Sequence, residues 1–566
     1  MKPTENVVSS VACIIAAAMV ALGLVNLALR LKEVQLDDVV LYAGAGERQS
    51  TRRVRTDGSR GRIVDRRGRV LAANRLTLSV ACDAAAYQKG SLSNTVARVL
   101  DDVMRVSEIV RRKPTVDAAG LRDAIRRRGA VPLELWHDVS DEELARFEEH
   151  SREYPGFFVV EDEDRVYPQA PLADRLIGSV RKAPGETDPS ENFYWATDEL
   201  RGCEGLECYY DAYLRGVPGE DRLRINSLGY TSARWTVEQA RPGLDLRLAL
   251  DAAIQHEAER QLNGCRGACV VMDPRTGDVL AAASSPGYFL AFGGEYAPGS
   301  TFKLITALAA LKMGVPPETT HNCNGSFALG AFKLRCTSRW GHGPMDLGHA
   351  LMKSCNPYFC NLGCDIGTNA LFSAARSFGL GSRTGIDFVL DRGGSVPSAE
   401  LKERVFHERW NQADLAATSI GQGMLLVTPL QMARVAGAIA TGYMVRPRLS
   451  LSLPVVRQPL PFSKPALDAV RRGMRMVVDG DGESRGTGWR GAMDVPAKVF
   501  GKTGTAEVGA GASRRKNTWF VAYATPTNVP SGQATVSVAM VIERGESGGG
   551  TTAPKVAEVL RRCFER

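Results

Sequence analysis

The feature that most constrains this chain is a long uncharged stretch near its start. Val7 to Leu29 is 23 residues without a charged side chain. As a helix it would extend roughly 34 Å, enough to cross the hydrocarbon core of a bilayer. Arg30 and Lys32 follow directly, whereas the apolar core of a cleaved signal peptide is only roughly 7–15 residues long. We therefore expect a membrane anchor within residues 1–30, with a cleaved signal as the alternative.

The rest of the chain has the composition of folded domains. Of its 566 residues, 44% are hydrophobic and 24% charged, which excludes a disordered or collagen-like protein. No second stretch is long enough to span a bilayer, so the bulk is expected on one side of the membrane. The net charge of +8 is mild for this length and does not indicate a nucleic-acid partner.

Two regions are expected after the anchor, which makes the chain an α+β or α/β multidomain protein. Residues 31–243 are predicted to form the first domain, which we call the pedestal, and the family resemblance described below implies that it is non-catalytic. Within it we expect a stalk over residues 30–56, amphipathic helices over residues 90–155 and a loop over residues 184–203. Ser140, three residues before Glu143, is typical of a capping box at a helix start.

Residues 244–566 are predicted to form the second domain. Apolar runs bounded by turn residues predict strands at Ala268–Asp273, Asp278–Ser284, Ala497–Thr505, Thr518–Tyr523 and Ala534–Glu543. Helices are expected at both ends of this domain, at Asp251–Leu262 and Ala553–Arg566, with a mostly helical block between the first strands and the last.

A basic run opens the pedestal. Between Arg48 and Arg69 there are nine arginines and only two acidic residues, Asp57 and Asp65. Such a run can contact anionic lipid or an acidic partner. It can also be a solvated face that forms salt bridges with acids elsewhere in the fold, and we favour this second interpretation.

The first of three chemically suggestive motifs in the second domain is Ser300-Thr301-Phe302-Lys303, which an apolar run follows. At a helix start, a lysine three residues after a serine lies on the same face, one turn on. Serine is a weak nucleophile until a base takes its proton. A lysine in an apolar pocket can lose its own proton and act as that base.

The other two motifs are Ser354-Cys355-Asn356, 54 residues after Ser300, and Lys502-Thr503-Gly504-Thr505, 148 residues further on. The first could relay a proton and hold a substrate carbonyl. In the second, the lysine supplies positive charge, the threonines supply hydroxyls for a carboxylate, and Gly504 leaves room for substrate against a strand. The backbone N–H groups of Ser300 and Thr505 are predicted to form an oxyanion hole. Each motif alone is weak, but the trio in this order marks β-lactamases and penicillin-binding proteins.

The chain resembles a class B penicillin-binding protein, a peptidoglycan D,D-transpeptidase, over nearly all residues beyond the anchor. In the pedestal the resemblance is carried by Arg60-Gly61-Arg62-Ile63-Val64-Asp65-Arg66, Arg165-Val166-Tyr167-Pro168 and Gly205-Leu206-Glu207 with Tyr210-Asp211. In the second domain it is carried by the trio and by Asp273-Pro274-Arg275-Thr276-Gly277, Gly421-Gln422-Gly423 and Thr428-Pro429-Leu430-Gln431.

This resemblance implies an elongated α+β pedestal and a transpeptidase domain with a central antiparallel sheet flanked by helices. It implies that Ser300 is acylated and that Lys303 is its general base. Ser354 and Asn356 would serve proton relay and substrate. The segment from Lys502 to Thr505 would bind the carboxylate of the terminal D-alanine.

Four residues also have the composition of a metal site. Cys323, Cys336, His342 and Cys355 follow the spacing C-x12-C-x5-H-x12-C. Three thiolates and one imidazole suit tetrahedral zinc. From the residues alone, a disulfide between Cys323 and Cys336 or unpaired buried thiols are alternatives. The stretch is similar to the penicillin-binding protein 2 group, whose members can hold zinc at positions matching His342 and Cys355, and with this resemblance we favour structural zinc.

The resemblance implies a serine-type D-Ala-D-Ala transpeptidase/carboxypeptidase that crosslinks peptidoglycan stem peptides and is inhibited by β-lactams. It implies a chain in the cytoplasmic (inner) membrane with its bulk on the periplasmic side, a lipid-II glycosyltransferase and other wall-synthesis membrane proteins as partners. Gly341-His342-Gly343 and the cysteine cluster favour a role in cell elongation and shape. The alternatives are a septal transpeptidase, a class D-like β-lactam hydrolase or sensor, and a non-enzymatic scaffold.

Overall fold

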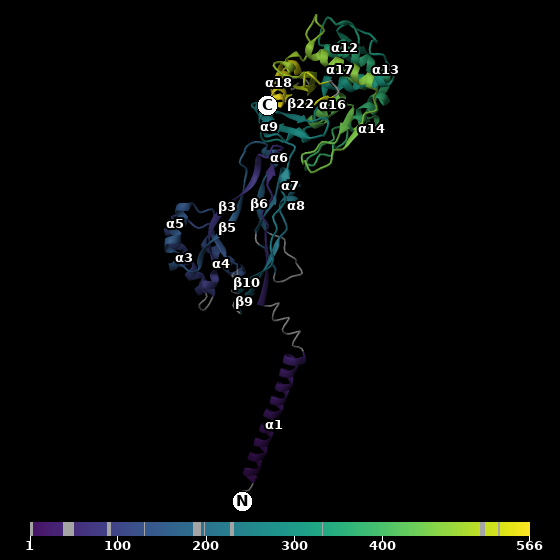
Figure 1. Ribbon diagram of the computed structural model, residues 1–566. Coiled ribbons are helices and arrows are strands. Elements are labelled where there is room, and N and C mark those ends of the chain that lie inside the picture. The colour runs from purple at the N-terminus through teal and green to yellow at the C-terminus, as the bar shows by residue number, and fades with distance from the viewer. Residues whose placement is uncertain are drawn as a thin grey trace.

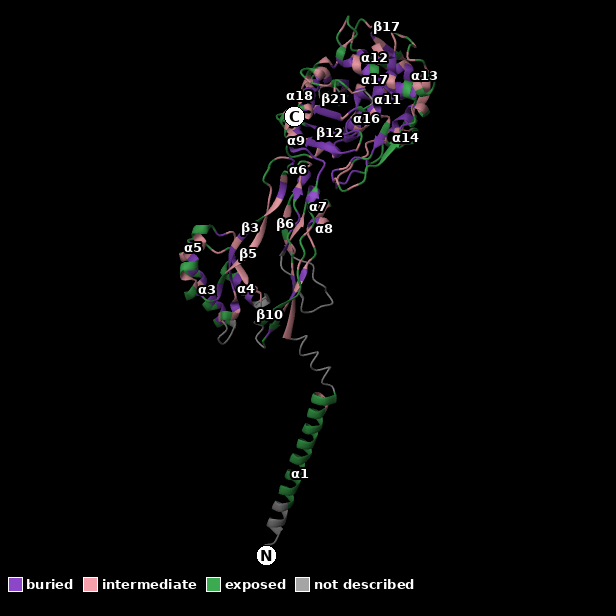
Figure 2. Ribbon diagram, viewed as in Figure 1, coloured by how far each residue is buried: buried purple, intermediate pink, exposed green. Residues whose placement is uncertain are grey.

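The computed structural model describes residues 4–37, 50–87, 92–128, 131–184, 194–196, 198–226, 231–330, 332–509, 515–529 and 533–565. Helix α1 (Thr4–Lys32) contains the uncharged stretch, and its side chains from Val11 onward are exposed (Figure 2). Within the described ranges it belongs to the one helical segment long and apolar enough to cross a membrane. So much exposed apolar surface marks a segment that is covered by lipid or another apolar partner.

The pedestal is an elongated α+β unit, with the C-terminal domain at the end away from strands β9 and β10 (Figure 1). One sheet has the order β10-β9-β1-β7, formed by β1 (Thr51–Thr56), β7 (Tyr194–Ala196), β9 (Gly219–Ile225) and β10 (Thr231–Glu238). A second sheet has the order β11-β2-β3-β4 with β5 also paired to β3, formed by β2 (Ile63–Val64), β3 (Val70–Cys82), β4 (Leu133–Trp136), β5 (Phe157–Val166) and β11 (Leu246–Arg247).

Two local expectations for the pedestal are wrong in part. The predicted stalk over residues 30–56 contains strand β1, because Thr51–Thr56 pairs along its whole length with β9. The predicted loop over residues 184–203 contains β8 (Asp198–Gly202), which pairs with β6 (Val180–Pro184). In both places ladder hydrogen bonds to a partner distant in sequence override weak local strand signals. Residues 38–49, 185–193 and 197 lie outside the described ranges.

Helices α3 (Leu92–Val110), α4 (Ala118–Arg128) and α5 (Asp141–His150) cover one end of the second sheet. Their apolar faces enclose a core that includes Val99, Trp136 and Phe147. The predicted capping box is confirmed: Ser140 Oγ accepts from Glu143 N–H, and the Glu143 carboxylate accepts from Ser140 N–H. Smaller helices follow at α6 (Asp174–Ile177), α7 (Gly205–Tyr209) and α8 (Asp211–Leu214).

The arginines of the basic run largely form salt bridges within the fold. Arg53 pairs with Glu220, Arg55 with Glu199, Arg62 with Asp245 and Arg67 with Asp251. These pairs confirm the interpretation of the run as a structural, partly solvated face.

The most buried pairs form what we call the pedestal ion network, namely Arg60, Arg165, Glu207 and Asp211. The Glu207 carboxylate accepts from Arg60 Nε and Arg165 Nε, each at 2.7 Å. Arg60 Nη1 also donates to Asp211 Oδ1 at 2.7 Å. The side chains of Arg60, Arg165 and Glu207 are at most 2% exposed. Three segments that carry the family resemblance therefore meet in one buried, charge-balanced cluster.

The contacts that bond the pedestal to the C-terminal domain include two groups on different elements. Asp65 Oδ2 accepts from Ala252 N–H at 3.2 Å, at the start of helix α9 (Ala252–Leu262), and Arg67 pairs with Asp251 at 2.8 Å. On the other side, the Tyr210 hydroxyl donates to Asp387 Oδ2 at 2.5 Å. We call these contacts the domain joint.

The C-terminal domain is built on a five-stranded antiparallel sheet of order β13-β12-β22-β21-β20, formed by β12 (Gly267–Met272), β13 (Val279–Ser284), β20 (Lys498–Val508), β21 (Arg515–Thr525) and β22 (Val536–Glu543). Val270 and Val271 are neighbours on β12 but face different core clusters, because successive side chains point to opposite faces of a sheet. Both faces are covered, so the strands are nearly continuous apolar runs, and the predicted strands are confirmed. Strand β20 lies at the edge.

Helices α9 and α18 (Ala553–Phe564) cover one face of this sheet. The other face is covered by α11 (Lys303–Lys312), α13 (Asn356–Ser377), α16 (Pro429–Thr441) and α17 (Lys464–Asp479). Shorter elements complete the domain: α10 (Leu290–Gly293), α12 (Leu347–Met352), α14 (Ala399–Phe406), α15 (Gln412–Ser419), and hairpins of β14 (His321–Cys323) with β17 (Gly343–Met345), β15 (Ser326–Leu329) with β16 (Phe332–Arg335), and β18 (Tyr443–Val445) with β19 (Arg457–Pro459). The predicted central antiparallel sheet flanked by helices is confirmed.

Candidate active site

Ser300 lies on a tight turn that leads directly into a buried helix. The turn is a 3-10 helix over Gly299–Phe302, and α11 continues from Lys303. The Ser300 side chain is half-buried, whereas Lys303 is fully buried. Gly299 has a φ of 53°, and a Cβ at this position would lie 2.8 Å from the Thr505 carbonyl oxygen. Glycine therefore lets the serine turn pack directly against strand β20.

Lys303 is a buried cation surrounded by neutral oxygens. Its Nζ donates to the Ser354 carbonyl at 2.8 Å, to Ser354 Oγ at 3.3 Å and to Asn356 Oδ1 at 2.7 Å. Burial removes water from the ammonium group and lowers the pKa of Lys303 to about 8. At pH 7 about a tenth of this side chain is thus the neutral amine that a general base requires.

Ser354 joins the two lysines of the predicted trio. Its Oγ accepts from Lys502 Nζ at 2.9 Å, in addition to the longer contact from Lys303. Lys502 is fully buried, and both its burial and the neighbouring charge of Lys303 lower the pKa of Lys502 well below its ordinary value. Within the described residues neither lysine has a carboxylate partner. Sequence positions 303, 354 and 502 therefore meet in one hydrogen-bonded cluster, which we call the lysine cluster.

The segment from Lys502 to Thr505 lies on β20, at the open edge of the sheet. Thr503 Oγ1 lies 3.0 Å from Thr487 Oγ1, and Thr505 Oγ1 accepts from Gly548 N–H at 3.4 Å. The prediction was that a glycine at position 504 leaves room for substrate, but the structure shows a different role. A Cβ there would come within 3.0 Å of Thr301, Pro298 and Trp519, so the glycine makes room for the serine turn.

Two further contacts at this site could not be predicted from local sequence. Asn356 Nδ2 donates to the Arg335 carbonyl at 2.8 Å, which uses both ends of the Asn356 amide. Thr487, in the loop between α17 and β20, contacts Thr503 and the Met352 carbonyl. A threonine between two glycines at positions 486 and 488 is the only local hint, and it is too common to single out a functional residue.

The four predicted metal ligands come together from four separate elements. Cys323 ends β14, Cys336 follows β16, His342 precedes β17, and Cys355 caps the N-terminus of α13. Their ligand atoms all lie within 4.8 Å of one another. The distances from His342 Nδ1 to the sulfurs of Cys323 and Cys336 are 3.6 and 3.5 Å. Tetrahedral zinc with ordinary bond lengths separates a nitrogen and a sulfur ligand by about 3.6 Å. We call this set the Cys3His cluster.

The chemistry of the thiols is consistent with metal binding. All twelve cysteines are present as thiols, so Cys323 and Cys336 are not joined in a disulfide. The Cys355 thiol hydrogen-bonds to Cys336, and backbone N–H groups of Asn356 and Ser338 add to it, so the pKa of Cys336 lies well below its ordinary value. The thiolate is the form that binds metals.

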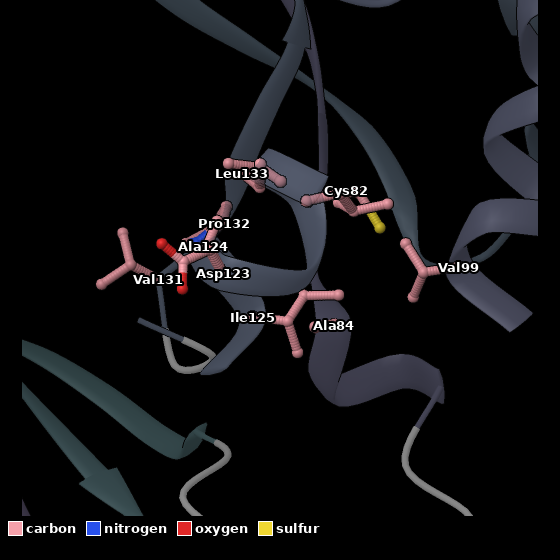
Figure 3. A pocket seen from close by; sticks show the side chains of 11 residues that line it. Cys82, Ala84, Val99, Asp123, Ala124, Ile125, Val131, Pro132 and Leu133 are labelled. Atoms are coloured by element: carbon pink, nitrogen blue, oxygen red, sulfur yellow. The ribbon is translucent and has the colours of Figure 1, made fainter. Parts of the chain in front are cut away.

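A separate cavity of about 350 Å³ lies in the pedestal, beneath helices α3 and α4 (Figure 3). Its walls are mostly apolar, with Val99, Ile125 and Leu133 among them. Burial raises the pKa of the Cys82 thiol in its wall to about 12, so this cysteine is not a reactive nucleophile. Since the cavity lacks a nucleophile–base pair, the lysine cluster is the better candidate for catalysis.

Comparisons with known proteins identify both domains of the chain. Residues 267–561 match the family model described as the penicillin-binding protein transpeptidase domain, and residues 55–248 match the penicillin-binding protein dimerisation domain. The peptidoglycan D,D-transpeptidase MrdA of Escherichia coli K12 is 28% identical over 561 residues, which cover 90% of this chain and 86% of that protein.

Solved structures are similar over most of the chain. The complex between penicillin-binding protein PBP2 and MreC from Helicobacter pylori contains a chain that is 25% identical, with a TM-score of 0.76, covering 91% of this chain and 98% of that one. A structure titled "Structural coordination of polymerization and crosslinking by a peptidoglycan synthase complex" contains a chain 26% identical, with a TM-score of 0.68, covering 99% of each chain.

Proposed function

This chain belongs to the penicillin-binding protein transpeptidase family, and from that premise we propose how its own residues carry out the reaction. It is a peptidoglycan D,D-transpeptidase of the elongation type. The observation that carries the residue assignment is the lysine cluster. Two buried lysines, both with lowered pKa values, converge on the Ser354 hydroxyl directly behind the turn that bears Ser300.

In the proposed acylation step, Ser300 Oγ attacks the carbonyl carbon between the two terminal D-alanines of a stem peptide. Lys303, as the neutral amine, takes the hydroxyl proton. The backbone N–H groups of Ser300 and Thr505 stabilise the developing oxyanion. The bond to the terminal D-alanine breaks, and its nitrogen receives a proton through Ser354, which leaves an ester on Ser300.

In the second step an amine from another stem peptide attacks that ester and releases Ser300. Substrate binding in this scheme uses the open edge of β20, since an exposed strand edge can pair with an extended peptide. Lys502 supplies positive charge for the carboxylate of the terminal D-alanine, and Thr503 and Thr505 supply hydroxyls. A β-lactam acylates the same serine because it presents a carbonyl and a carboxylate to the same groups.

The test is to incubate the full-length protein with glycan strands that carry pentapeptide stems. Crosslinked stem dimers and free D-alanine are expected, and mass spectrometry of a penicillin adduct should place the label on the peptide that contains Ser300. A label elsewhere would reject the assignment of the nucleophile. Rapid release of opened penicillin without crosslinking would instead favour the β-lactam hydrolase.

We also propose that the Cys3His cluster holds one structural zinc ion. The ligand atoms lie within 4.8 Å of one another and the two distances from His342 Nδ1 to sulfur suit tetrahedral zinc, and such a metal would fix Cys355 and thereby its neighbours Ser354 and Asn356. Elemental analysis of the purified protein should give about one equivalent of zinc, and removal of zinc should make Cys323 and Cys336 available to alkylation. Much less zinc, together with a crosslink between Cys323 and Cys336, would reject the metal site.

Finally, we propose that α1 anchors the chain in the cytoplasmic membrane, with the pedestal and the C-terminal domain on the periplasmic side, beside a lipid-II glycosyltransferase and other wall-synthesis membrane proteins. Support comes from the relatives solved in complex with MreC and in a peptidoglycan synthase complex. Crosslinking in intact cells followed by mass spectrometry should identify a glycosyltransferase among the captured proteins. Cleavage of the C-terminal domain by protease added to spheroplasts would confirm its side of the membrane.

A further inference from the structure

Ser354 is held in a backbone conformation that a serine does not adopt unaided. Its φ is 54°, in the left-handed region that favours glycine. A residue held there is strained and persists only where its surroundings fix it. In this conformation its Oγ lies 2.9 Å from Lys502 Nζ and 3.3 Å from Lys303 Nζ. Whatever fixes the backbone before Ser354 therefore also fixes the lysine cluster.

The loop between α17 and β20 provides that support. The Met352 carbonyl, two residues before Ser354, accepts from both Thr487 N–H at 3.3 Å and Thr487 Oγ1 at 3.1 Å. Lys353 Nζ donates to Ser484 Oγ of the same loop at 2.5 Å. The residues immediately before Ser354 are thus held through a backbone carbonyl and through a side chain.

Thr487 also reaches the strand that carries Lys502. Its Oγ1 lies 3.0 Å from Thr503 Oγ1. A hydroxyl has one proton, so with the Thr487 proton on the Met352 carbonyl, Thr503 donates its own proton to Thr487 in the free enzyme, and it turns that proton to the carboxylate when substrate binds. One half-buried side chain consequently bridges the segment that bears Ser354 and the strand that bears Lys502.

The loop that presents Thr487 is itself closely packed. Gly488 N–H donates to the Val477 carbonyl at 2.8 Å. A Cβ at Gly486 would lie 2.1 Å from that same oxygen, and a Cβ at Gly549 would lie 2.2 Å from the Thr487 carbonyl. The backbone at Thr487 is therefore fixed on both sides, and a change confined to its hydroxyl tests the hydroxyl alone.

We propose that Thr487 is a positioning residue for acylation. Its hydroxyl ties the Met352 carbonyl to Thr503 and so holds the Ser354 hydroxyl between Lys303 and Lys502. It acts through Ser354 and does not touch substrate. This inference rests on the proposed acylation of Ser300 and adds a residue outside the three motifs on which that assignment stands.

The test compares Thr487→Val, which has the same shape without the hydroxyl, with Thr487→Ser, which keeps the hydroxyl. The rate of labelling by a fluorescent penicillin is followed at several concentrations, which separates the dissociation constant of the initial complex from the acylation rate constant. We expect Thr487→Val to lower the acylation rate constant about tenfold, as for the loss of bonds made by one buried hydroxyl. Its dissociation constant should stay within about twofold, and Thr487→Ser should restore the wild-type rate.

Thr441→Val is the matched control, because the Thr441 hydroxyl also donates to backbone carbonyls but lies at the far end of α16. It should acylate at the wild-type rate. The proposal is overturned if Thr487→Val acylates like the wild type, if only its dissociation constant changes, or if Thr441→Val slows acylation equally. Failure of the wild type to be labelled at Ser300 would reject the proposed function itself, which is a separate outcome.

Discussion

The pedestal and the C-terminal domain both bury basic side chains almost completely, but they surround them differently. In the pedestal, Arg60 and Arg165 share the Glu207 carboxylate, so the buried charges balance. In the C-terminal domain, the hydrogen-bond acceptors of Lys303 and Lys502 among the described residues are hydroxyl, amide and carbonyl oxygens, with no carboxylate.

This difference separates a structural use of buried charge from a catalytic one. An arginine keeps its proton in a protein, so the pedestal ion network can hold segments together at any physiological pH. A lysine without a counter-ion has its pKa lowered by burial and can release and take up a proton. The residue type and its partner together indicate whether a buried cation is structural or catalytic. Substitutions in the two domains should therefore have different effects on stability and on acylation.

The largest effect is expected from Ser300→Ala. Removal of the nucleophile should abolish penicillin labelling, and losses on the order of 10⁶-fold are known for serine hydrolases. Gel fluorescence and mass spectrometry measure it. The variant should unfold at the wild-type temperature, because Ser300 is only half-buried and hydrogen-bonds to no other side chain in the described part of the chain. Undiminished labelling would mean that another residue is acylated.

Lys303→Arg keeps the positive charge but removes the ability to lose a proton. Acylation should fall roughly 10²- to 10⁴-fold, the usual contribution of a general base. Arg60→Lys in the pedestal is the counterpart: it loses the fork of N–H donors that binds Glu207 and Asp211 and so should destabilise the pedestal, but it changes no proton-transfer group. Its acylation rate should match the wild type. Near-normal acylation in Lys303→Arg would mean that Lys303 is only a structural cation, like the buried arginines of the pedestal.

Glu207→Gln should destabilise the pedestal strongly without changing chemistry. It leaves Arg60 and Arg165 buried without their shared carboxylate, and breaking a buried pair in this way costs about 3–5 kcal/mol. Denaturant unfolding measures the loss. Asp101→Asn, which removes an exposed pair with Arg105 on α3, is the control and should cost less than about 1 kcal/mol. Equal effects in the two variants would show that burial of the network contributes nothing.

His342→Ala tests whether the Cys3His cluster supports the lysine cluster. Loss of a ligand should lower thermal stability and slow acylation roughly 10- to 100-fold, because Cys355 lies between Ser354 and Asn356. His349→Ala on α12, an exposed histidine paired with Asp346, is the control and should be nearly silent. A silent His342→Ala, with Cys323 and Cys336 resistant to alkylation until reduced, would favour a disulfide.

The smallest effect is the pH dependence of acylation. The neutral form of Lys303 is the active one, so the rate should rise with pH through a midpoint of about 8 and gain about tenfold between pH 7 and its plateau. The titratable groups that face Lys303 are Lys502 and the thiols of Cys336, Cys355 and Cys360. Glu207→Gln should keep the same midpoint, since the pedestal ion network does not reach these groups. A flat profile would contradict the assignment of Lys303 as the base.

Much of this molecule could be predicted from local sequence. Apolar runs in the sequence predict the strands of the C-terminal sheet, and a four-residue pattern predicts the Ser140 capping box. A separation of one helical turn predicts that Ser300 and Lys303 lie on the same face. These features depend on neighbours in the chain. The Cys3His set could also be named, because thiol and imidazole side chains are rare enough for their grouping to be informative.

Other features could not be predicted because they depend on partners distant in sequence. Strand β8 forms only because β6 lies beside it. The left-handed conformation of Ser354 and the role of Thr487 arise where α12, β20 and a loop meet. The glycine at position 504 makes room for Thr301 and Trp519, which no local pattern connects to it.

The domain joint has a mechanical consequence. Asp387 accepts a hydrogen bond from the Tyr210 hydroxyl and two more from the backbone N–H groups of Leu449 and Ser450. Asp65 accepts a hydrogen bond from the first turn of α9. These attachments lie on different elements, so together they resist twisting of one domain against the other more than either would alone. A force applied to the pedestal near β1 and β10 therefore acts through a lever that runs the length of the pedestal. The short arm of that lever ends inside the C-terminal domain, so a force at one end is delivered as torque at the other.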